Sequence, residues 1–454
     1  MSADLALAGK ALAATCPAVR EGEAADAIAG VTPSFVASPA SVSEAAALMR
    51  AAAEYGLAVV PRGAGSRLAW GTPPVRIDLA VDTRKMDAVT EHAAGDLVAR
   101  VQAGARMGAV ARTLAAAGQE IALDVPPEAT VGGVVASALA GPRRLRYGSP
   151  RDLLIGITIV RADGTVAHAG GKVVKNVAGY DLGKLFAGSW GTLGLITDVT
   201  FRLHPLPAAR AYVTTTFPEG GPIWSASLPS LHDAGAAEAI ALAANSPLTA
   251  SAVQFYRPSL GGPSHVGVLL EGSAEGVAAR AARLADGIAS GAGAQVSAEP
   301  PPWWPGMPDP GDGTLVQVSF WQSALPGVLA AIDDADPDGQ VRPTVSGPAG
   351  AGVLYVTPHA GVPTRTVARF VGALRERLHH ARGSVSVLTA PSAVRAALDG
   401  YGGMTGPVPS LRLMRAVHDQ FDPDHRMSPG RFPTEDVRRG VLRVLSPRQS
   451  TEGA

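Results

Sequence analysis

The chain has 454 residues, long enough for two or three domains with sizeable cores. Hydrophobic residues make up 46% and charged residues 17%, which is typical of a globular chain and excludes a disordered one. Basic and acidic residues balance at 39 each and aromatic residues reach only 5%, so neither net charge nor base stacking favours a nucleic-acid partner.

Cysteine usage and the absence of long apolar runs point to the cytoplasm. Cys16 is the single cysteine, so an intrachain disulfide is excluded, and one thiol cannot hold an iron–sulfur cluster, which usually takes four. Segment 1–20 lacks the pattern of a signal peptide, and no run of about 18 strongly apolar residues occurs. Any association with the inner membrane is therefore expected to come through a partner subunit.

The amino-terminal half alternates helical and strand patterns. Ser41 and Glu44 have the spacing of a capping box, apolar residues follow at helical spacing to Ala53, and Gly56 is a plausible stop. A β-hairpin is expected around Asp163-Gly164, a pair that readily takes the positive φ angles of a tight turn. Other expected elements are strands at 57–60, 77–81, 97–101, 155–161, 165–168 and 195–203 and a helix at about 107–117.

In the carboxy-terminal half, strands alternate with helices, which predicts an antiparallel sheet with helices on one face. Trp303 and Trp304, in the loop Pro300–Gly313, are expected to form a hydrophobic plug, with a binding surface as the alternative. The expected strands are 266–270, 315–320, 353–356 and 384–388, and the expected helices are 274–288, 324–332, 364–379 and 410–421. Residues beyond about 435 are expected to form a frayed helix or an extension.

Three glycine-rich loops carry the chemical signal. Segments 61–66, 130–133 and 188–194 place small residues where backbone amides can approach a pyrophosphate, and segment 130–133 opens a helix whose amides would favour phosphate. A Rossmann G-x-G-x-x-G after a strand and a P-loop are both absent, as are H-E-x-x-H and paired C-x-x-C motifs.

The order of five strings resembles a known family. These are V-P-R-G-A-G-S (60–66), P-E-A-T-V-G-G (127–133), Y-G-S-P-R-D-L (147–153), K-N-V-A-G-Y-D-L (175–182) and G-S-W-G-T-L-G-L-I-T (188–197). Together they resemble the PCMH-type FAD-binding fold of the vanillyl-alcohol oxidase superfamily, and within it the E subunits of bacterial glycolate oxidases. The likeness is strong over about 32–207, loose in the middle, and returns in a closing motif at 421–432.

The resemblance implies an α+β fold: a PCMH-type FAD-binding domain of two α+β subdomains, an antiparallel sheet-plus-helices cap domain, and a carboxy-terminal segment that returns to the FAD domain. The expected boundaries are 1–30 for an amino-terminal helical segment, 31–207 for the FAD-binding domain, 208–395 for the cap and 396–454 for the carboxy-terminal helix and tail.

The resemblance also implies a cofactor site. The backbone of 62–66 would cradle the FAD pyrophosphate, and the main chain of Ile196 would pair with the adenine edge. Ser66 lies near a position at which some members tether the flavin but is a poor nucleophile, so FAD is expected to be noncovalent. The implied cofactor-binding residues are Arg62, Gly63, Ala64, Gly65, Ser66, Pro126, Ala129, Thr130, Gly132, Gly133, Tyr147, Gly148, Arg151, Asp152, Gly191, Gly194 and Ile196.

Two departures from the family pattern bear on catalysis. Relatives that oxidise D-2-hydroxy acids carry H-x-G-D-G-N-x-H and E-H-G-x-G metal motifs, and neither occurs here. The histidines at 232, 265, 359, 379 and 380 are scattered, with His359 expected at the surface, so no metal site and no catalytic base are assigned. Met427-Ser428 stands where relatives commonly have Asn, which puts a contact between the tail and the flavin in question.

Two further groups of residues leave alternatives open. Arg143, Arg144 and Arg146 suit a carboxylate or an FAD phosphate, or else form a solvated positive loop. Lys175, Asn176 and Tyr180 would either reach the flavin or pack a glycine-rich loop.

The expected function is that of the FAD-binding subunit of a multi-subunit glycolate oxidase, an FAD-dependent oxidoreductase that acts on a CH–OH group. A sister FAD subunit and an iron–sulfur subunit would be its partners, and a small 2-hydroxy acid its substrate. The alternatives are a self-sufficient FAD-dependent 2-hydroxy-acid or alcohol oxidoreductase, and a non-catalytic scaffold subunit with a flavin fold.

Overall fold

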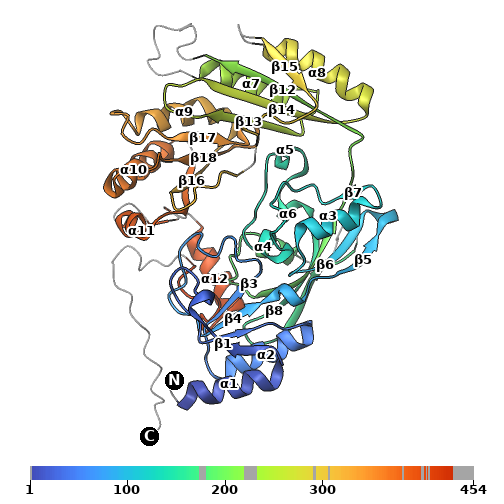
Figure 1. Ribbon diagram of the computed structural model, residues 1–454, viewed down its shortest axis with the longest axis vertical. Helices are drawn as coiled ribbons and strands as arrows, with labels where there is room; N and C mark the ends of the chain where they lie inside the picture. The colour runs from blue at the N-terminus through green and yellow to red at the C-terminus, as the bar shows by residue number, and fades with distance from the viewer. Residues whose placement is uncertain are drawn as a thin grey trace.

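The computed structural model describes residues 3–172, 180–218, 233–289, 293–304, 307–380, 383–399, 403–404, 406 and 410–432. Two small sheets occupy the amino-terminal half, and one large sheet dominates the carboxy-terminal half (Figure 1). Within these ranges, no helix combines the length and apolar character needed to cross a membrane. The expected tail beyond 435 and the residues Lys175 and Asn176 lie outside the described residues.

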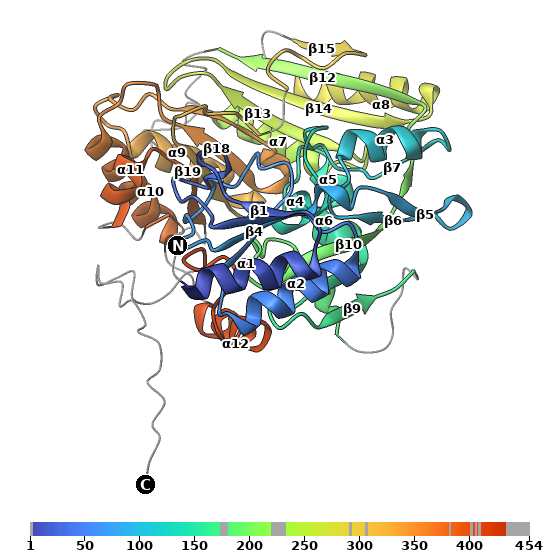
Figure 2. The same cartoon turned by 60° about the horizontal axis from the view of Figure 1, so that its bottom comes forward.

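The first subdomain packs two helices against a four-stranded sheet of order β1-β2-β4-β3 (Figure 2). Strands β2, β4 and β3 run parallel, and β1 is antiparallel to β2. Helix α2 buries Ala45, Leu48 and Met49 at helical spacing and is followed by Gly56 at φ 59°, so the predicted helix and its stop are confirmed. The elements are α1 (Ala3–Thr15), β1 (Val19–Glu21), β2 (Phe35–Ala37), α2 (Val42–Glu54), β3 (Val59–Arg62) and β4 (Leu79–Asp82).

The start of α2 departs from the predicted capping box in one respect. The Ser41 side chain accepts a hydrogen bond from the Glu44 amide at 3.2 Å, as predicted. The Glu44 carboxylate accepts from the amide of Ala40 at 3.0 Å rather than from that of Ser41. The glutamate side chain is long enough to reach the amide one residue before the N-cap. The second hydrogen bond of the capping box is therefore made with Ala40 instead of Ser41.

The second subdomain is a five-stranded antiparallel sheet of order β5-β6-β10-β8-β9. Short helices α4 and α6 pack against it, and a small ribbon, β7 with β11, lies beside α3. The strands are β5 (Val89–Ala93), β6 (Val98–Gln102), β7 (Gln119–Glu120), β8 (Leu154–Val160), β9 (Val166–Gly170), β10 (Leu195–Arg202) and β11 (His204–Pro205), and the helices are α3 (Met107–Ala115), α4 (Val131–Ala136), α5 (Arg144–Tyr147) and α6 (Pro150–Leu153).

The hairpin between β8 and β9 forms as predicted, but its turn is different. Gly164 has a positive φ of 79°, whereas Asp163 does not. Arg161 donates its amide to the Thr165 carbonyl at 2.9 Å and accepts from the Gly164 amide at 2.9 Å, which makes a three-residue loop. The prediction of positive φ at both residues is therefore wrong, because a three-residue loop needs it only at the closing glycine.

The cap is an eight-stranded antiparallel sheet of order β15-β12-β14-β13-β17-β18-β16-β19, so the predicted antiparallel sheet is confirmed. Helices α7 to α10 cover its outer face over one large apolar core (Figure 1). The strands are β12 (Ala209–Phe217), β13 (Ala252–Arg257), β14 (Ser264–Gly272), β15 (Ala294–Ser297), β16 (Leu315–Ser319), β17 (Thr344–Gly347), β18 (Val353–Thr357) and β19 (Ser384–Thr389), and the helices are α7 (Ala234–Asn245), α8 (Ala274–Ile288), α9 (Leu325–Asp334), α10 (Thr364–His380) and α11 (Ser392–Leu398).

The two tryptophans cover the opposite face of the cap sheet. Trp304 packs edge-on against Tyr212 at 4.9 Å between ring centroids, and Trp303 stacks on Tyr256 at 5.8 Å. A Cβ added at Gly267 would approach Trp303 to 2.7 Å. Strand β14 therefore has glycine at the position on which the tryptophan rings pack. The interpretation as a hydrophobic plug is confirmed.

The carboxy-terminal segment returns to the amino-terminal half after α12 (Leu411–Phe421). Phe421 packs edge-on against Phe186 at 5.5 Å between ring centroids. Met427 forms a parallel bridge with Val59 at the start of β3. The end of the described chain thus lies beside the strand that leads into the first glycine-rich loop (Figure 1).

Candidate cofactor site

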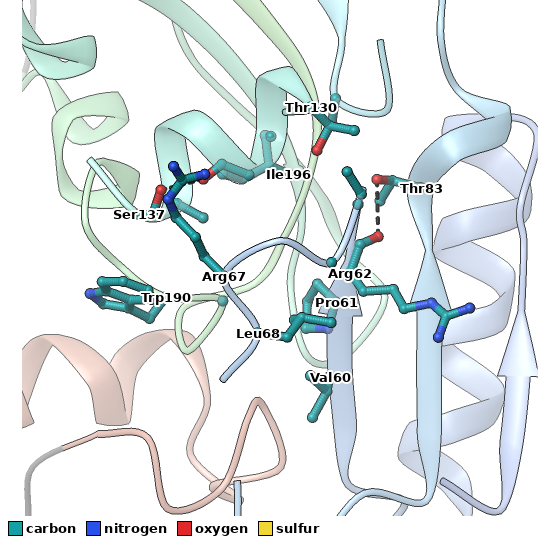
Figure 3. A pocket seen from close by; sticks show the side chains of 18 of the residues that line it. Val60, Pro61, Arg62, Arg67, Leu68, Thr83, Thr130, Ser137, Trp190 and Ile196 are labelled. Carbon is teal, nitrogen blue, oxygen red and sulfur yellow. Dashed lines mark hydrogen bonds between the residues drawn. The ribbon is translucent and has the colours of Figure 1, made fainter. Parts of the chain in front are cut away.

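The three glycine-rich loops predicted from the sequence converge on one pocket (Figure 3). They approach from the end of β3, from the start of α4 and from the residues that lead into β10. The pocket holds about 820 Å³ of empty space, counted with the solvent at its open mouth. Of the residues implied by the family resemblance, it is lined by Arg62, Gly63, Ala64, Gly65, Ser66, Ala129, Thr130, Gly132, Gly133, Gly191, Gly194 and Ile196.

The glycines of the first two loops are required by close packing. A Cβ at Gly63 would lie 2.0 Å from Thr130 Oγ1, and a Cβ at Gly132 would lie 2.9 Å from the Cβ of Ala103. Gly65 has φ 83°, a conformation that favours glycine. Side chains at these positions would separate the loops, so the pocket depends on their being glycine.

The backbone amides of the first two glycine-rich loops, 61–66 and 130–133, differ in whether they are free to bind a ligand. Among the described residues, nothing accepts a hydrogen bond from the amides of Ala64, Gly65 or Ser66, which can therefore serve an anion. The amides of Val131 and Gly132 already donate to Ala105 and Ala103 at 2.9 and 2.8 Å. The predicted supply of free amides at the start of α4 is therefore wrong for these two residues, because carbonyls of the residues that follow β6 accept from them.

Polar side chains at the pocket also lack partners. Thr130 is buried, and its Oγ1 makes no hydrogen bond among the described residues. The same holds for Nε of Arg67, whose guanidinium lies over the Trp70 ring, 4.9 Å from its centroid. Burial lowers the pKa of Arg67 from its ordinary value. An unpartnered hydroxyl and a guanidinium with an unpartnered Nε suit a phosphate or a polyhydroxylated chain.

Arg431, from the closing motif, completes one wall of the pocket. Its guanidinium donates to the carbonyl of Trp70 at 3.0 Å and to that of Leu68, so it holds the end of the first loop. Burial lowers the pKa of Arg431 to about 10, and the side chain remains cationic at neutral pH. Ser428 Oγ donates to the carbonyl of Gly191 at 3.1 Å, so the tail contacts the third loop although Asn is absent.

Other implied residues lie away from the pocket lining. Tyr147 donates to Glu271 Oε2 at 3.1 Å, and Asp152 accepts from the amide and hydroxyl of Ser149 at the start of α6. Gly148 has φ 84° and packs on Asp152. Pro126 and Arg151 are also outside the lining, and Tyr180 is 90% exposed. The structure gives Tyr147, Gly148 and Asp152 packing and capping contacts within the fold.

Arg143, from the arginine triplet, binds carboxylates, and these belong to the protein itself. Arg143 is 7% exposed, and its guanidinium contacts Glu120 and Asp124 at 2.7 Å each and Glu271 at 3.4 Å. Its anions are therefore protein carboxylates, so it is neither solvated nor free to bind an FAD phosphate. The neighbouring Arg146 donates to Ser251 Oγ and to the Glu271 carbonyl of the cap.

Several lining residues were missed by sequence reasoning: Val60, Pro61, Arg67, Leu68, Thr83, Ala103, Ala136, Ser137, Trp190, Leu195 and Arg431. Arg67 adjoins Ser66 and Trp190 adjoins Gly191, both already recognised, and Arg431 belongs to the closing motif. Thr83 and Ala103 come from strand ends, and only the fold brings them to the pocket.

The fold is similar to that of solved flavoproteins, among them one of the VAO type. Residues 33–170 match the family model described as "FAD binding domain". Over 95% of this chain and 97% of the other, the fold matches p-cresol methylhydroxylase with substrate bound, at a TM-score of 0.72 and 15% identity. A VAO-type flavoprotein from Myceliophthora thermophila C1 matches over 88% of this chain and 79% of its own, at a TM-score of 0.60 and 16% identity.

Sequence relatives include subunits of glycolate oxidase. The glycolate oxidase subunit GlcD of Bacillus subtilis (strain 168) is 35% identical over 39% of this chain and 38% of its own length. The glycolate oxidase subunit GlcE of Escherichia coli (strain K12) is 37% identical over 33% of this chain and 43% of its own. The D-lactate dehydrogenase of Archaeoglobus fulgidus is 35% identical over 40% of this chain and 41% of its own length. The chain thus spans about two fifths of the length of these curated relatives.

Proposed function

We propose that this chain is the FAD-binding subunit of a multi-subunit glycolate oxidase. The observation that carries the proposal is the pocket at which Ala64, Gly65 and Ser66 offer free amides and Thr130 a buried, unpartnered hydroxyl. Amides and hydroxyls of this kind would hold a diphosphate and a ribityl chain. FAD bound there would supply a two-electron acceptor for the oxidation of glycolate to glyoxylate.

Noncovalent binding of FAD is part of the proposal, and the side chains at the pocket support it. The described lining residues include no cysteine, histidine or tyrosine. The hydroxyls of Ser66, Ser137, Thr83 and Thr130 remain, and they are weak nucleophiles. FAD released into solution by acid precipitation of the protein would agree with this, whereas flavin retained on the precipitate would contradict it.

Partner subunits are part of the proposal because of what this chain lacks. It has one cysteine, Cys16, which is buried in the core of the first subdomain. Four cysteines are the usual requirement of an iron–sulfur cluster, so electrons that leave the flavin for such a centre would pass to another chain. A cytoplasmic location, with membrane contact only through a partner, belongs to the same proposal.

A self-sufficient 2-hydroxy-acid oxidoreductase is the second candidate, and it is favoured by a specific pair of groups. The Tyr355 hydroxyl, on the cap face opposite the helices, is buried without a partner among the described residues, and burial raises the pKa of Tyr355 to about 12. Tyr355 lies in a cluster with Trp70, on the loop that carries Arg67. Arg67 would bind a substrate carboxylate, and Tyr355 would donate to it.

One experiment distinguishes the glycolate oxidase subunit from the self-sufficient oxidoreductase. The purified chain is expected to be yellow, with a flavin visible spectrum that anaerobic glycolate leaves unbleached in the absence of partner subunits. Bleaching by glycolate alone would favour the self-sufficient enzyme. A well-folded, colourless chain that refuses added FAD would overturn both and leave a scaffold role.

A further inference from the structure

Two histidines and one carboxylate meet at the end of α12, away from the cofactor pocket. Asp419 Oδ1 lies 3.7 Å from His418 Nδ1 and 3.5 Å from His425 Nε2, and the three ligand atoms are all within 4.8 Å of one another. The two imidazole rings stack at 5.0 Å between centroids. His418 and His425 were not among the histidines that the sequence analysis considered.

These atoms converge without hydrogen bonds. His418 is 3% exposed, and its Nδ1 has no hydrogen-bond partner among the described residues; the same is true of Asp419 Oδ1. Both contacts are too long for hydrogen bonds. Buried polar atoms of native proteins are almost always satisfied, so an unpartnered nitrogen that faces an unpartnered carboxylate oxygen calls for a third participant.

A metal ion fits the spacing and the chemistry. Zinc takes imidazole nitrogen and carboxylate oxygen at about 2.0–2.2 Å, so neighbouring ligands of a tetrahedral site lie roughly 3.3–3.5 Å apart. The observed 3.5 and 3.7 Å approach this range. Two imidazoles favour zinc and similar transition metals over calcium or magnesium.

We propose that His418, Asp419 and His425 bind one Zn²⁺ ion, with water as the fourth ligand. The side chains of Asp419 and His425 are 45% and 55% exposed, which leaves a path for the ion and room for water. The ion joins the end of α12 to the turn that follows it. Asp422 fixes this turn by accepting from the amides of His425 at 3.1 Å and Met427 at 2.7 Å.

The site has a structural consequence for the pocket. The residues shortly after His425 include Ser428, which contacts the third glycine-rich loop, and Arg431, which contacts Leu68 and Trp70 just beyond the first. A metal that holds the turn in place therefore stabilises the wall that these residues build. The proposed role is structural, and it stands whether or not the proposed function is correct.

The test is a zinc titration of the full-length, untagged chain after treatment with EDTA. We expect one Zn²⁺ per chain by calorimetry and elemental analysis, a higher melting temperature with Zn²⁺, and visible absorption when Co²⁺ replaces it. His425→Gln and Asp419→Asn are expected to weaken Zn²⁺ binding by at least about tenfold. Both side chains are partly exposed, so the fold should survive, and circular dichroism checks it.

His359→Gln is the matched control. His359 is exposed, as predicted, and its Nδ1 lies 2.8 Å from the neighbouring carbonyl of Ala360. This variant should bind Zn²⁺ like the wild type. The proposal is overturned if the wild-type chain shows no saturable Zn²⁺ binding, or if His425→Gln and Asp419→Asn bind it as tightly as His359→Gln does.

Discussion

At the scale of single residues, the glycine pattern predicted the loops of the pocket but not their polar groups. Which amides are free depends on distant residues: Ala103 and Ala105 occupy the amides of Gly132 and Val131. The burial of Thr130 Oγ1 likewise depends on Gly63 from another loop. Contacts between loops far apart in the chain leave no local signal in the sequence. Sequence patterns therefore identified the glycine-rich loops but not which of their hydrogen-bond donors are free.

Gly63→Ala tests the contact between the first two loops. The new methyl would lie 2.0 Å from Thr130 Oγ1, so one of the loops must move. Overpacking of this kind costs roughly 1–3 kcal/mol. We expect FAD affinity to fall about tenfold or more in a fluorescence titration of the apoprotein. Gly95→Ala is the control, because a Cβ there meets nothing within 4 Å and no positive φ is required. Equal affinities would contradict the assigned role of Gly63.

At the scale of elements, the spacing of apolar residues predicted amphipathic helices such as α8 but not the alanine-rich helix α7. Helix α8 was predicted over its full length, 274–288, whereas α7 was not predicted at all. In α7, Ala236, Ile240 and Ala243 are buried, but alanine on both faces leaves no polar–apolar contrast. Strand β13 was missed as well, and it ends in Arg257, a charge buried to 1% exposure that sequence patterns place at the surface.

Arg257→Met tests how the cap helices are attached to the sheet. The guanidinium bonds Asp233 before α7 and Asp333 in α9 at 2.6 Å each. Methionine keeps much of the volume but leaves buried carboxylates without their cation, which costs about 3–5 kcal/mol. We expect a large drop in the urea concentration at the unfolding midpoint. Adding Asp233→Asn and Asp333→Asn to the Arg257→Met chain should restore part of the lost stability. A midpoint within error of the wild type would mean that the triad contributes little.

At the scale of the whole molecule, an ionic cluster joins the cap to the FAD-binding half. Glu271, on β14 of the cap, contacts Arg143 and Tyr147 of the FAD-binding half and accepts from Arg210 Nε at 2.9 Å. Its side chain is 1% exposed. The general layout, with an FAD-binding domain, an antiparallel cap and a returning tail, followed from the family resemblance. This cluster did not, because its members come from separate parts of the chain.

Glu271→Gln is expected to weaken the attachment of the cap. The amide keeps the shape of the side chain but removes the charge that faces two arginines, which should cost about 1–3 kcal/mol at neutral pH. Thermal unfolding measures the change. The control is Glu91→Gln, which removes an exposed ion pair with Lys172 and should shift stability by less than about 1 kcal/mol.

The pH dependence of this difference identifies its electrostatic origin. Burial alone would raise the pKa of Glu271, but Arg143, a hydrogen bond with Ser251 and Arg210 together outweigh it. The folded pKa therefore lies below the ordinary value of 4.5. A carboxyl with a lowered folded pKa contributes stability that is complete above the unfolded pKa and is lost as pH falls through the folded one. The gap in melting temperature between wild type and Glu271→Gln should therefore be constant from pH 7 to about pH 5 and shrink below about 4.5. A gap that stays the same in acid would show that the lost stability comes from packing rather than from the charge on Glu271.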